Sequence, residues 1–286
     1  MATEREIRRR VKSVKNIQQV TKAQQTISAS KMRRAQAATL ASRPYEEKLR
    51  TVLNDLAPYA EAETHPLLAR RPVQRSLIVL ITSDRGFVGA QNTNMVRAAL
   101  RHAGSLPAAS WISVGRKGMA QLRRFRQTAI AEFSGLGDRP TSADTAPISA
   151  VLQDEFLSGR VDEVFLSFTR FVNTMKQEPT FRRILPLVPE DEDIDALPPI
   201  QYLFEPDPET VLGAVLPRLI EVTVYQAVLE NIASEHSARL IAMRNATDAA
   251  ADLIQELTLA ANKARQARIT KEMLEIVSGA EALAKG

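Results

Sequence analysis

The sequence predicts an α/β protein in which long N- and C-terminal helices pair as an antiparallel coiled coil, with a small Rossmann-like α/β domain inserted between them. Three observations predict this fold. Arg218–Ser278 contains neither proline nor glycine and would form a helix of roughly 90 Å. A second run without these residues precedes Pro44. Between the two runs, strand-like and helix-like patterns alternate, as in domains built on a largely parallel sheet.

The C-terminal helix is too long to be buried in a globule of this chain. A compact protein of 286 residues has a diameter of about 50 Å, so the helix must project and find a partner. Apolar and small residues recur alternately three and four positions apart, the 3.5-residue period of a left-handed coiled coil. The partner that the sequence offers is the helix expected over residues 4–57. The predicted seam is Leu219, Val222, Gln226, Leu229, Ala233, His236, Leu240, Met243, Thr247, Ala250, Ile254, Leu257, Ala261 and Ala264.

The elements follow in order along the chain. In the first helix an apolar stripe begins at Ile7 and turns small and polar beyond Val20. Pro44 either kinks this helix or ends its first part, and Pro58 closes it. The α/β domain is expected to contain strands at Ser76–Thr82, Trp111–Val114, Thr128–Phe133, Glu163–Phe171 and Thr180–Leu187, and helices at Arg116–Phe125 and Ala143–Leu157.

The last helix has a clear start signal. Asp207, Pro208 and Glu209 supply an N-cap, a proline at the first helical position and an acid in the first turn. Pro217 is expected to kink this helix, and the Pro-rich, acidic stretch before it to be a loop. We therefore divide the chain into an N-terminal coiled-coil helix (1–58), an α/β domain (74–190) and a C-terminal coiled-coil helix (207–286).

Composition excludes several classes of function. The chain has no cysteine and only three histidines, far apart in sequence, so we expect no disulfide, no thiolate chemistry and no metal site. No apolar run approaches the roughly 20 residues that span a bilayer. No H-E-x-x-H, G-x-S-x-G or Walker A motif occurs. The carboxylates of Glu190–Asp195 are best explained as solvated loop charge, and His236 as a polar seam residue that sets register.

Charge is concentrated at the N-terminus. Residues 1–43 hold eleven basic and two acidic residues, a net charge of +9 in a chain whose total is +5. Such an arm attracts nucleic acid, anionic lipid or an acidic protein surface, and it also mimics an organellar transit peptide. The arm has no interleaved aromatic residues and no helix-turn-helix pattern, which argues against a grip on nucleic acid.

Two glycine-bearing turns follow predicted strands. Ser83–Gly89 and Gly115–Gly118 could each hold a phosphate at the start of a helix. The alternative is that both are structural turns that let the next helix pack, and we favour it because neither matches a complete phosphate-binding motif. An enzyme with a phosphate ligand at Arg85–Gly89 and a basic coiled-coil scaffold or nucleic-acid protein remain as rival hypotheses.

Motifs at both ends and in the middle carry a specific resemblance. In this order along the chain they resemble the gamma subunit of F-type ATP synthases. They are Ile7–Ala23, Ala29–Gln36, Asp84–Gly86, Glu205–Pro208, Ala233–Glu235, Ala238–Arg239, Ala242–Met243, Ala246–Asp248, Asn262–Glu272 and Glu275–Ala280.

The resemblance implies a rotor shaft. In this family the terminal helices form a coiled coil inside a hexamer of alternating alpha and beta subunits, and the α/β domain sits at the foot against the epsilon subunit and the c-subunit ring. It implies a non-catalytic subunit that binds no cofactor and transmits torque during ATP synthesis or hydrolysis. It also implies a peripheral place on a membrane, reached only through the c ring, with no nucleic-acid partner. Because the first motif starts near Met1, we expect the cytoplasmic side of a bacterial inner membrane rather than an organellar membrane.

Residues are carried over by their place in the motifs. Lys22 in the neck, Arg239, and Gln266, Thr270 and Glu272 near the tip match positions that contact the beta subunits. Tyr202, Phe204 and Glu205 match the region that rests on the c ring. For each, the plain alternative is a solvated helix position.

The sequence departs from the family pattern at the neck. Gln24, Gln25 and Thr26 stand where the family usually has methionine-rich residues. We therefore expect a more polar neck with a weaker or water-mediated contact to the beta subunit. The cysteine-bearing regulatory insertion of chloroplast forms is absent.

Overall fold

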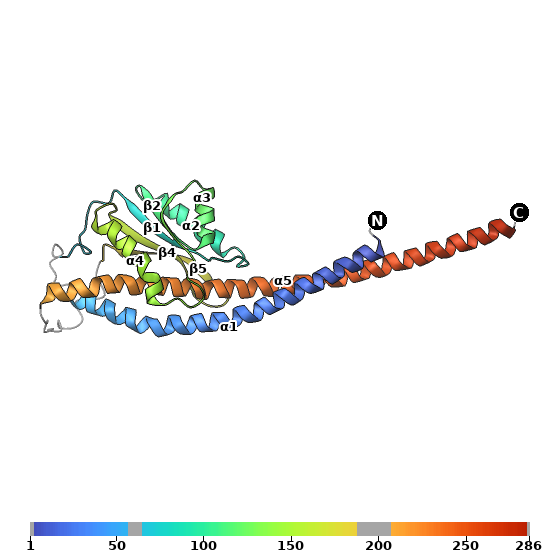
Figure 1. Ribbon diagram of the computed structural model, residues 1–286, viewed down its shortest axis with the longest axis horizontal. Helices are drawn as coiled ribbons and strands as arrows, with labels where there is room; N and C mark the ends of the chain where they lie inside the picture. Colours follow the sequence, from blue (N-terminus) through green and yellow to red (C-terminus); the bar gives the residue numbers. More distant parts are fainter. Residues whose placement is uncertain (1–2, 57–64, 188–206, 285–286) are drawn as a thin grey trace. The chain divides into compact units, whose positions relative to one another are not determined.

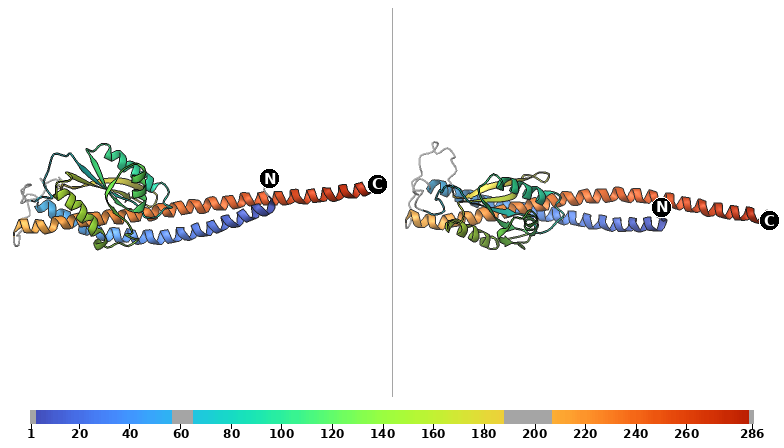
Figure 2. Two further views of the ribbon diagram at one scale, coloured as in Figure 1. Left: turned by 45° about the horizontal axis from the view of Figure 1, so that its top comes forward. Right: turned by 90° about the horizontal axis from the view of Figure 1, so that it is seen from above.

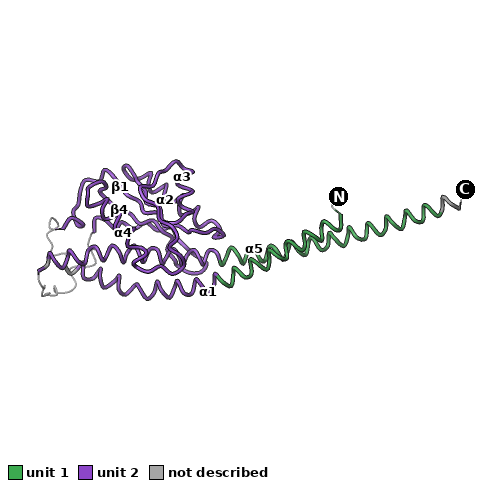
Figure 3. Tube along the Cα trace, in the orientation of Figure 1, with its two compact units in different colours: residues 1–27, 240–286 green, residues 28–239 purple. Residues whose placement is uncertain are grey.

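The computed structural model describes residues 3–56, 65–187 and 207–284. By its internal contacts the chain divides into two compact units, coloured in Figure 3: the smaller comprises Met1–Ile27 and Leu240–Gly286, and the larger comprises Ser28–Arg239. Two long helices run through both units. The first, α1 (Glu4–Leu56), has 53 residues, and the last, α5 (Pro208–Ala284), has 77.

The larger unit contains one five-stranded sheet of order β3-β2-β1-β4-β5 (Figure 1). The strands are β1 (Ser76–Ile81), β2 (Ala109–Val114), β3 (Ala129–Phe133), β4 (Glu163–Phe171) and β5 (Gln177–Leu185). The first four are parallel, and β5 pairs antiparallel with β4. The largely parallel sheet is thus confirmed. The fifth strand begins and ends earlier than the predicted Thr180–Leu187.

Helices cover both faces of the sheet, because β1 is buried on both sides and its side chains alternate between two cores. Ile78 and Leu80 pack with Trp111 and with α2 (Gln91–Ala103) and α3 (Arg116–Arg124). Leu77, Val79 and Ile81 pack with α4 (Ser142–Leu157) and α5 in the other core. Figure 1 shows these layers. The helix α2, which follows the Ser83–Gly89 turn, is not among the elements predicted from the sequence.

The segment of α5 in the larger unit is a central helix of the core. No residue from Leu219 to Arg239 is exposed, and the apolar ones join the core that includes the sheet, α4, and Ala35 and Leu53 of α1. Residues 28–56 and 208–239 run side by side in both views of Figure 2. In this unit α1 and α5 are antiparallel. Lys31 of α1 and His236 of α5 both contact Asp138, whereas Ser42, later in α1, bonds to Gln226, which is earlier in α5.

In the smaller unit, burial follows the predicted seam. Among residues 240–264, every seam position is buried or half-buried, and of the other residues there only Ile241, Ala242 and Ala246 are not exposed. Thr21 and Thr247 are hydrogen-bonded at 2.8 Å between their hydroxyls. Glu4 at the start of α1 pairs with Arg268 at 3.2 Å. The helices of this unit are therefore antiparallel as well, and the predicted 3.5-residue period is confirmed.

The prolines do not end the helices. Pro44 lies inside α1 and Pro217 inside α5, and both helices continue through them. The possibility that Pro44 ends the first helix is thus wrong, while the kink expected at Pro217 stays a prediction. The described elements fall within the three predicted segments 1–58, 74–190 and 207–286. The two compact units do not coincide with these segments, because each unit contains part of both long helices. The division into three segments therefore stays a prediction.

Within the described residues, α5 is the one helix long and apolar enough to cross a membrane by length and composition. More than half of its most apolar stretch, 56%, is buried inside the protein. A helix in a protein core that is buried on all sides can be as apolar as a membrane-spanning helix. The burial of residues 219–239 in the core therefore explains the apolar composition of this part of α5.

Two helical glycines have opposite surroundings and should respond oppositely to substitution. A Cβ on Gly118 would lie 2.6 Å from Thr82 Oγ1, whereas one on Gly213 would meet nothing within 4 Å. We expect Gly118→Ala to lower the free energy of unfolding by about 1–3 kcal/mol through overpacking. We expect Gly213→Ala to raise it by about 0.5–1 kcal/mol through the helix propensity of alanine. Urea unfolding of the full chain measures both, and equal effects would contradict the packing around Thr82.

Candidate functional site

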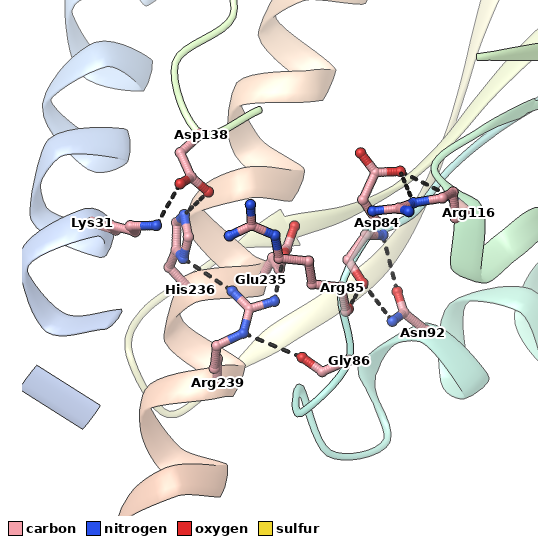
Figure 4. Close-up of polar contacts among 11 residues, drawn as sticks. Lys31, Asp84, Arg85, Gly86, Asn92, Arg116, Asp138, Glu235, His236 and Arg239 are labelled. Carbon is pink, nitrogen blue, oxygen red and sulfur yellow. Dashed lines mark hydrogen bonds and ion pairs between the residues drawn. The ribbon is translucent and has the colours of Figure 1, made fainter. Parts of the chain in front are cut away.

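The parallel strands end at one edge of the sheet, and the loops that follow them meet α5 there. In open α/β sheets, ligands bind outside the carboxyl ends of the strands. A cavity of about 160 Å³ lies at this edge, lined by the turns after β1, β2 and β3 and by Val228–Glu235 of α5. Figure 4 shows the polar residues beside it.

Asp84 holds three of these turns together. Its Oδ1 accepts a hydrogen bond from the backbone N–H of Arg116 at 3.0 Å, and its Oδ2 accepts one from Gly135 at 2.8 Å. The carboxylate therefore sits at the N-terminus of α3, where a helix favours negative charge. Asp84 belongs to the turn after β1, Arg116 follows β2 and Gly135 follows β3, so one side chain ties together the ends of three strands.

The other donors at the start of α3 are also used. Lys117 N–H donates to the Ser83 carbonyl at 3.0 Å, and Gly118 N–H donates to Thr82 Oγ1 at 2.8 Å. Gly115 makes this approach possible, since it has φ +97° and a Cβ there would lie 2.2 Å from the Thr82 carbonyl oxygen. The N–H groups that could cradle a phosphate are thus occupied by the protein itself. This favours the structural explanation of the Gly115–Gly118 turn.

The turn after β1 is fixed on its other side by Asn92 of α2. Ser83 N–H donates to Asn92 Oδ1 at 3.2 Å, and Asn92 Nδ2 donates to Ser83 Oγ at 2.6 Å. Both residues are buried. A reciprocal pair of this kind leaves the turn little freedom to open for a ligand.

A second polar cluster centres on His236, which is 2% exposed (Figure 4). Its Nδ1 lies 3.2 Å from Arg239 Nη1. Because arginine can only donate, Nδ1 accepts, and in the neutral ring Nε2 carries the hydrogen. That Nε2 is 3.2 Å from Asp138 Oδ1, and Asp138 Oδ2 accepts a hydrogen bond from Lys31 Nζ at 2.5 Å. His236 thus connects α5 to the loop before α4 and, through Asp138, to α1.

This arrangement corrects the interpretation of His236 as a residue that sets coiled-coil register. Its ring contacts the loop residue Asp138 and its own helix neighbour Arg239, and reaches α1 only indirectly. Burial, together with the charges of Arg239 and Lys31, lowers the pKa of His236 from 6.5 to about 4, although Asp138 opposes this. Burial raises the pKa of Asp138, but the Lys31 hydrogen bond and nearby positive charges outweigh it and leave that pKa lowered.

Arg239 is 7% exposed and is engaged inside the chain. Its Nε donates to the Gly86 carbonyl at 3.3 Å, and its Nη2 pairs with Glu235 at 2.5 Å. Burial raises the pKa of Glu235, and the charge of Arg239 partly offsets this. The assignment of Arg239 to a beta-subunit contact stays a prediction, and the structure gives this side chain an internal role as well.

The remaining predicted site residues lie elsewhere. Lys22, Gln266, Thr270 and Glu272 are exposed side chains of the smaller unit, and Glu272 makes one long ion pair, 3.9 Å, with Arg268. Their assignment to the beta subunits stays a prediction. Tyr202, Phe204 and Glu205 lie outside the described residues. At the neck, Gln24 and Thr26 are exposed and Gln25 is half-buried.

Sequence reasoning missed Asp138, Lys31 and the buried serines Ser234 and Ser237. Two signals could have found them. Gly135 and Gly137 precede Asp138 directly after a strand, the usual place for site residues in an α/β fold. From Val222 to Ala238 the helix carries only two charged residues, and a helix that is apolar all round is buried on every side.

The bonds to Asp84 give a prediction about stability. Asp84→Asn would place an amide NH₂ against a backbone N–H that now bonds to a carboxylate oxygen. We expect the free energy of unfolding to fall by about 2 kcal/mol. The control is Glu132→Gln, which removes an exposed ion pair with Arg123 and should change stability by less than about 1 kcal/mol. Equal effects of both variants in urea unfolding would count against the role of Asp84.

The burial of neutral His236 gives a prediction about pH. Its pKa is lower in the folded chain than the ordinary 6.5, so its stabilising contribution is complete above pH 6.5. That contribution is lost as the pH falls from 6.5 towards about 4. Glutamine can accept from Arg239 and donate towards Asp138 without titrating. Thermal unfolding of the full chain should therefore depend less on pH between 7 and 5 in His236→Gln than in the natural sequence, and parallel curves would contradict the assignment.

Comparison with known proteins gives consistent results over the whole chain. A sequence model of the family described as ATP synthase matches residues 3–283. The ATP synthase gamma chain of Dehalococcoides mccartyi is 48% identical over 99% of this chain and 100% of its own length. That of Roseiflexus castenholzii is 46% identical, with both chains covered completely.

Solved structures share the fold. A chain of the Euglena gracilis mitochondrial ATP synthase, solved as OSCP/F1/c-ring in rotational state 3, has a TM-score of 0.72 at 23% identity and covers 98% of this chain and 94% of its own. A chain of the central stalk and c-ring structure from Tetrahymena thermophila has a TM-score of 0.61 at 22% identity, covering 79% and 99%. Given the identity and the full coverage of the bacterial relatives, this chain belongs to the gamma-chain family of the F-type ATP synthases.

Proposed function

We propose that this chain is the central-stalk rotor of an F-type ATP synthase. As a subunit of that complex it would turn inside the hexamer of alpha and beta subunits and carry torque between this hexamer and the c-subunit ring. An asymmetric shaft presents a different face to each catalytic site and so biases the three sites towards different states. By linkage, nucleotide binding and hydrolysis at those sites can drive the shaft in return.

The observation that carries this proposal is the uncovered end of α5. Glu4 is the first residue of α1, and its partner on α5 is Arg268. Beyond Arg268, α5 continues to Ala284 without a partner helix among the described residues. An isolated helix is marginal in water, and this one carries large apolar side chains that are 47–71% exposed. They are Ile269, Met273, Leu274, Ile276 and Val277.

These side chains are suited to burial inside an apolar channel. Ile269, Met273, Ile276 and Val277 recur at helical spacing and lie along one stripe. In this family the alpha and beta subunits surround a central bore, which would form such a channel. Gln266, Thr270 and Glu272 lie on the same turns with exposed side chains, where they would meet the catalytic subunits.

The other contacts are assigned by the family pattern. Lys22 would meet the beta subunit at the polar neck, and Tyr202, Phe204 and Glu205 would rest on the c ring, with the epsilon subunit beside the α/β domain. The chain would be non-catalytic and bind no cofactor of its own, because nucleotide chemistry belongs to its partners. It would be attached through the c ring to the cytoplasmic side of a bacterial membrane.

Two findings weigh against the rival functions. The reciprocal hydrogen bonds between Ser83 and Asn92 hold the turn after β1 in place, which disfavours an enzyme with a phosphate ligand at Arg85–Gly89. The uncovered apolar stripe disfavours a nucleic-acid scaffold, since phosphate contacts need basic side chains. Copurification with alpha and beta subunits and coupled ATPase activity would separate the rotor from both rivals, and salt-sensitive retention on DNA would favour the scaffold.

The apolar tip gives a prediction about assembly. Deletion of Lys271 onward should leave the α/β domain folded while weakening assembly or torque. Met273→Gln/Ile276→Gln/Val277→Gln keeps the helix length and removes only apolar surface. Loss of that burial should weaken association with the alpha–beta hexamer by roughly tenfold or more. Titration of labelled chain against the hexamer measures this.

A matched control is Lys271→Gln/Glu275→Gln, which removes an exposed ion pair of the same turns and leaves the stripe intact. The far-ultraviolet circular dichroism of each variant reports whether the fold is kept. Unchanged assembly and unchanged coupled ATP synthesis in the deletion variant would contradict the role of the tip.

A further inference from the structure

One short stretch of α5 contacts four separate parts of the α/β body. We call Ser234, His236, Ser237 and Arg239 the collar, and Asp138 the loop residue that it meets. Two residues of Ser234–Arg239, Glu235 and Ala238, are not part of the collar. Glu235 pairs with Arg239. All four collar residues are buried, Ser234 and Ser237 completely.

The two serines attach α5 to β4 and to the hairpin that follows it. Ser234 Oγ donates to the Thr169 carbonyl at 2.9 Å, and Ser237 Oγ donates to the Thr174 carbonyl at 2.8 Å. Gln177, at the start of β5, donates from Nε2 to Ser237 Oγ at 3.2 Å. Ser237 is thus bonded on both sides of the hairpin.

The other two collar residues reach the opposite half of the sheet edge. His236 lies 3.2 Å from Asp138, in the loop between β3 and α4, and Arg239 donates to Gly86 in the turn after β1. Asp138 in turn bonds to Lys31 of α1. The contacts therefore leave α5 in several directions within little more than one helical turn, because residues 234, 236, 237 and 239 point to different sides of a helix.

From this geometry we propose that the collar locks the α/β body to α5 against rotation about the helix axis, and that it is the element through which torque passes between them. Apolar contacts resist separation, but they are non-directional and resist rotation weakly. Hydrogen bonds are directional, and several of them spread around one helix must break together before the body can turn. This inference rests on the rotor function proposed above.

Small residues make the attachment possible. Ala233 directly precedes the collar, Ala238 lies between Ser237 and Arg239, and both are buried, so the body comes close enough for the short serine side chains to reach main-chain carbonyls. The collar residues act through the body and not on the catalytic sites. They are positioning residues, and their test needs a mechanical measurement.

The test compares two double variants that lose the same chemistry. Ser234→Ala/Ser237→Ala removes two hydroxyl-to-carbonyl bonds that join α5 to the body. Ser105→Ala/Ser158→Ala removes hydroxyl-to-carbonyl bonds made within the body, from Ser105 to His102 and from Ser158 to Asp154 and Glu155. Alanine keeps α5 helical. Because the chain has no cysteine, Arg124→Cys at an exposed position gives a unique attachment point for a bead on the body.

The measurement is the torsional stiffness of the complex, with the hexamer fixed and the bead on the body, together with the ratio of protons pumped to ATP hydrolysed in vesicles. We expect both to fall at least about twofold in the collar variant relative to the control, with unloaded ATPase activity kept. His236→Gln should retain stiffness, and His236→Ala should lose it. If the collar double variant does not assemble, Asp138→Asn, at a half-buried position, provides the same comparison and should give a smaller fall.

The proposal for the collar would be overturned if the variants that assemble had the same torsional stiffness and the same pumping ratio as the control. A lower unfolding temperature alone would not support it, because a purely structural role changes only the unfolding temperature. Failure of the unsubstituted chain to turn the bead or to couple pumping to hydrolysis would instead overturn the rotor function itself.

Discussion

Along residues 219–239, α5 is enclosed by the sheet and α4 on one flank and by α1 on the other. The larger unit depends on this burial, because the face of the sheet that packs on α4 and α5 has no other cover among the described elements. The helix in turn gains a fixed position from the sheet. Small side chains such as Ala227, Ala233 and Ser234 bring the backbones close, and the polar groups buried by that approach find main-chain partners. Packing and hydrogen bonding thus specify the same position for the helix.

Much of the fold could be predicted from local patterns. The strand at Glu163–Phe171 and the helix at Arg116 were placed to within a residue, because buried β-branched runs and glycine turns act locally. The seam from Leu240 to Ala264 also followed from its period. Bounds for α2 were missing, since its start carries no side-chain cap, and β5 was placed too late because an edge strand is only partly buried and its pattern is weak.

The candidate site was less predictable than the fold. Asp84 and Gly86 were recognised as part of a turn, but the carboxylate's partners, Arg116 and Gly135, are 32 and 51 residues away along the chain. No local pattern specifies such pairs. His236 was placed correctly on the seam and given the wrong partner, because a seam position predicts burial but does not say which element covers it. The roles of Lys22, Gln266, Thr270 and Glu272 depend on other chains and stay predictions.

The collar serines and Arg239 donate to the carbonyls of Thr169, Thr174 and Gly86, which every residue type possesses. The body can therefore change the side chains of these loops in evolution and still present the same acceptors, provided that the backbone keeps its path. Divergence is then constrained on the helix and permitted on the loops. A fold retained at 23% identity is compatible with that freedom, and exchange of the α/β body between distant relatives becomes a practical route to hybrid chains.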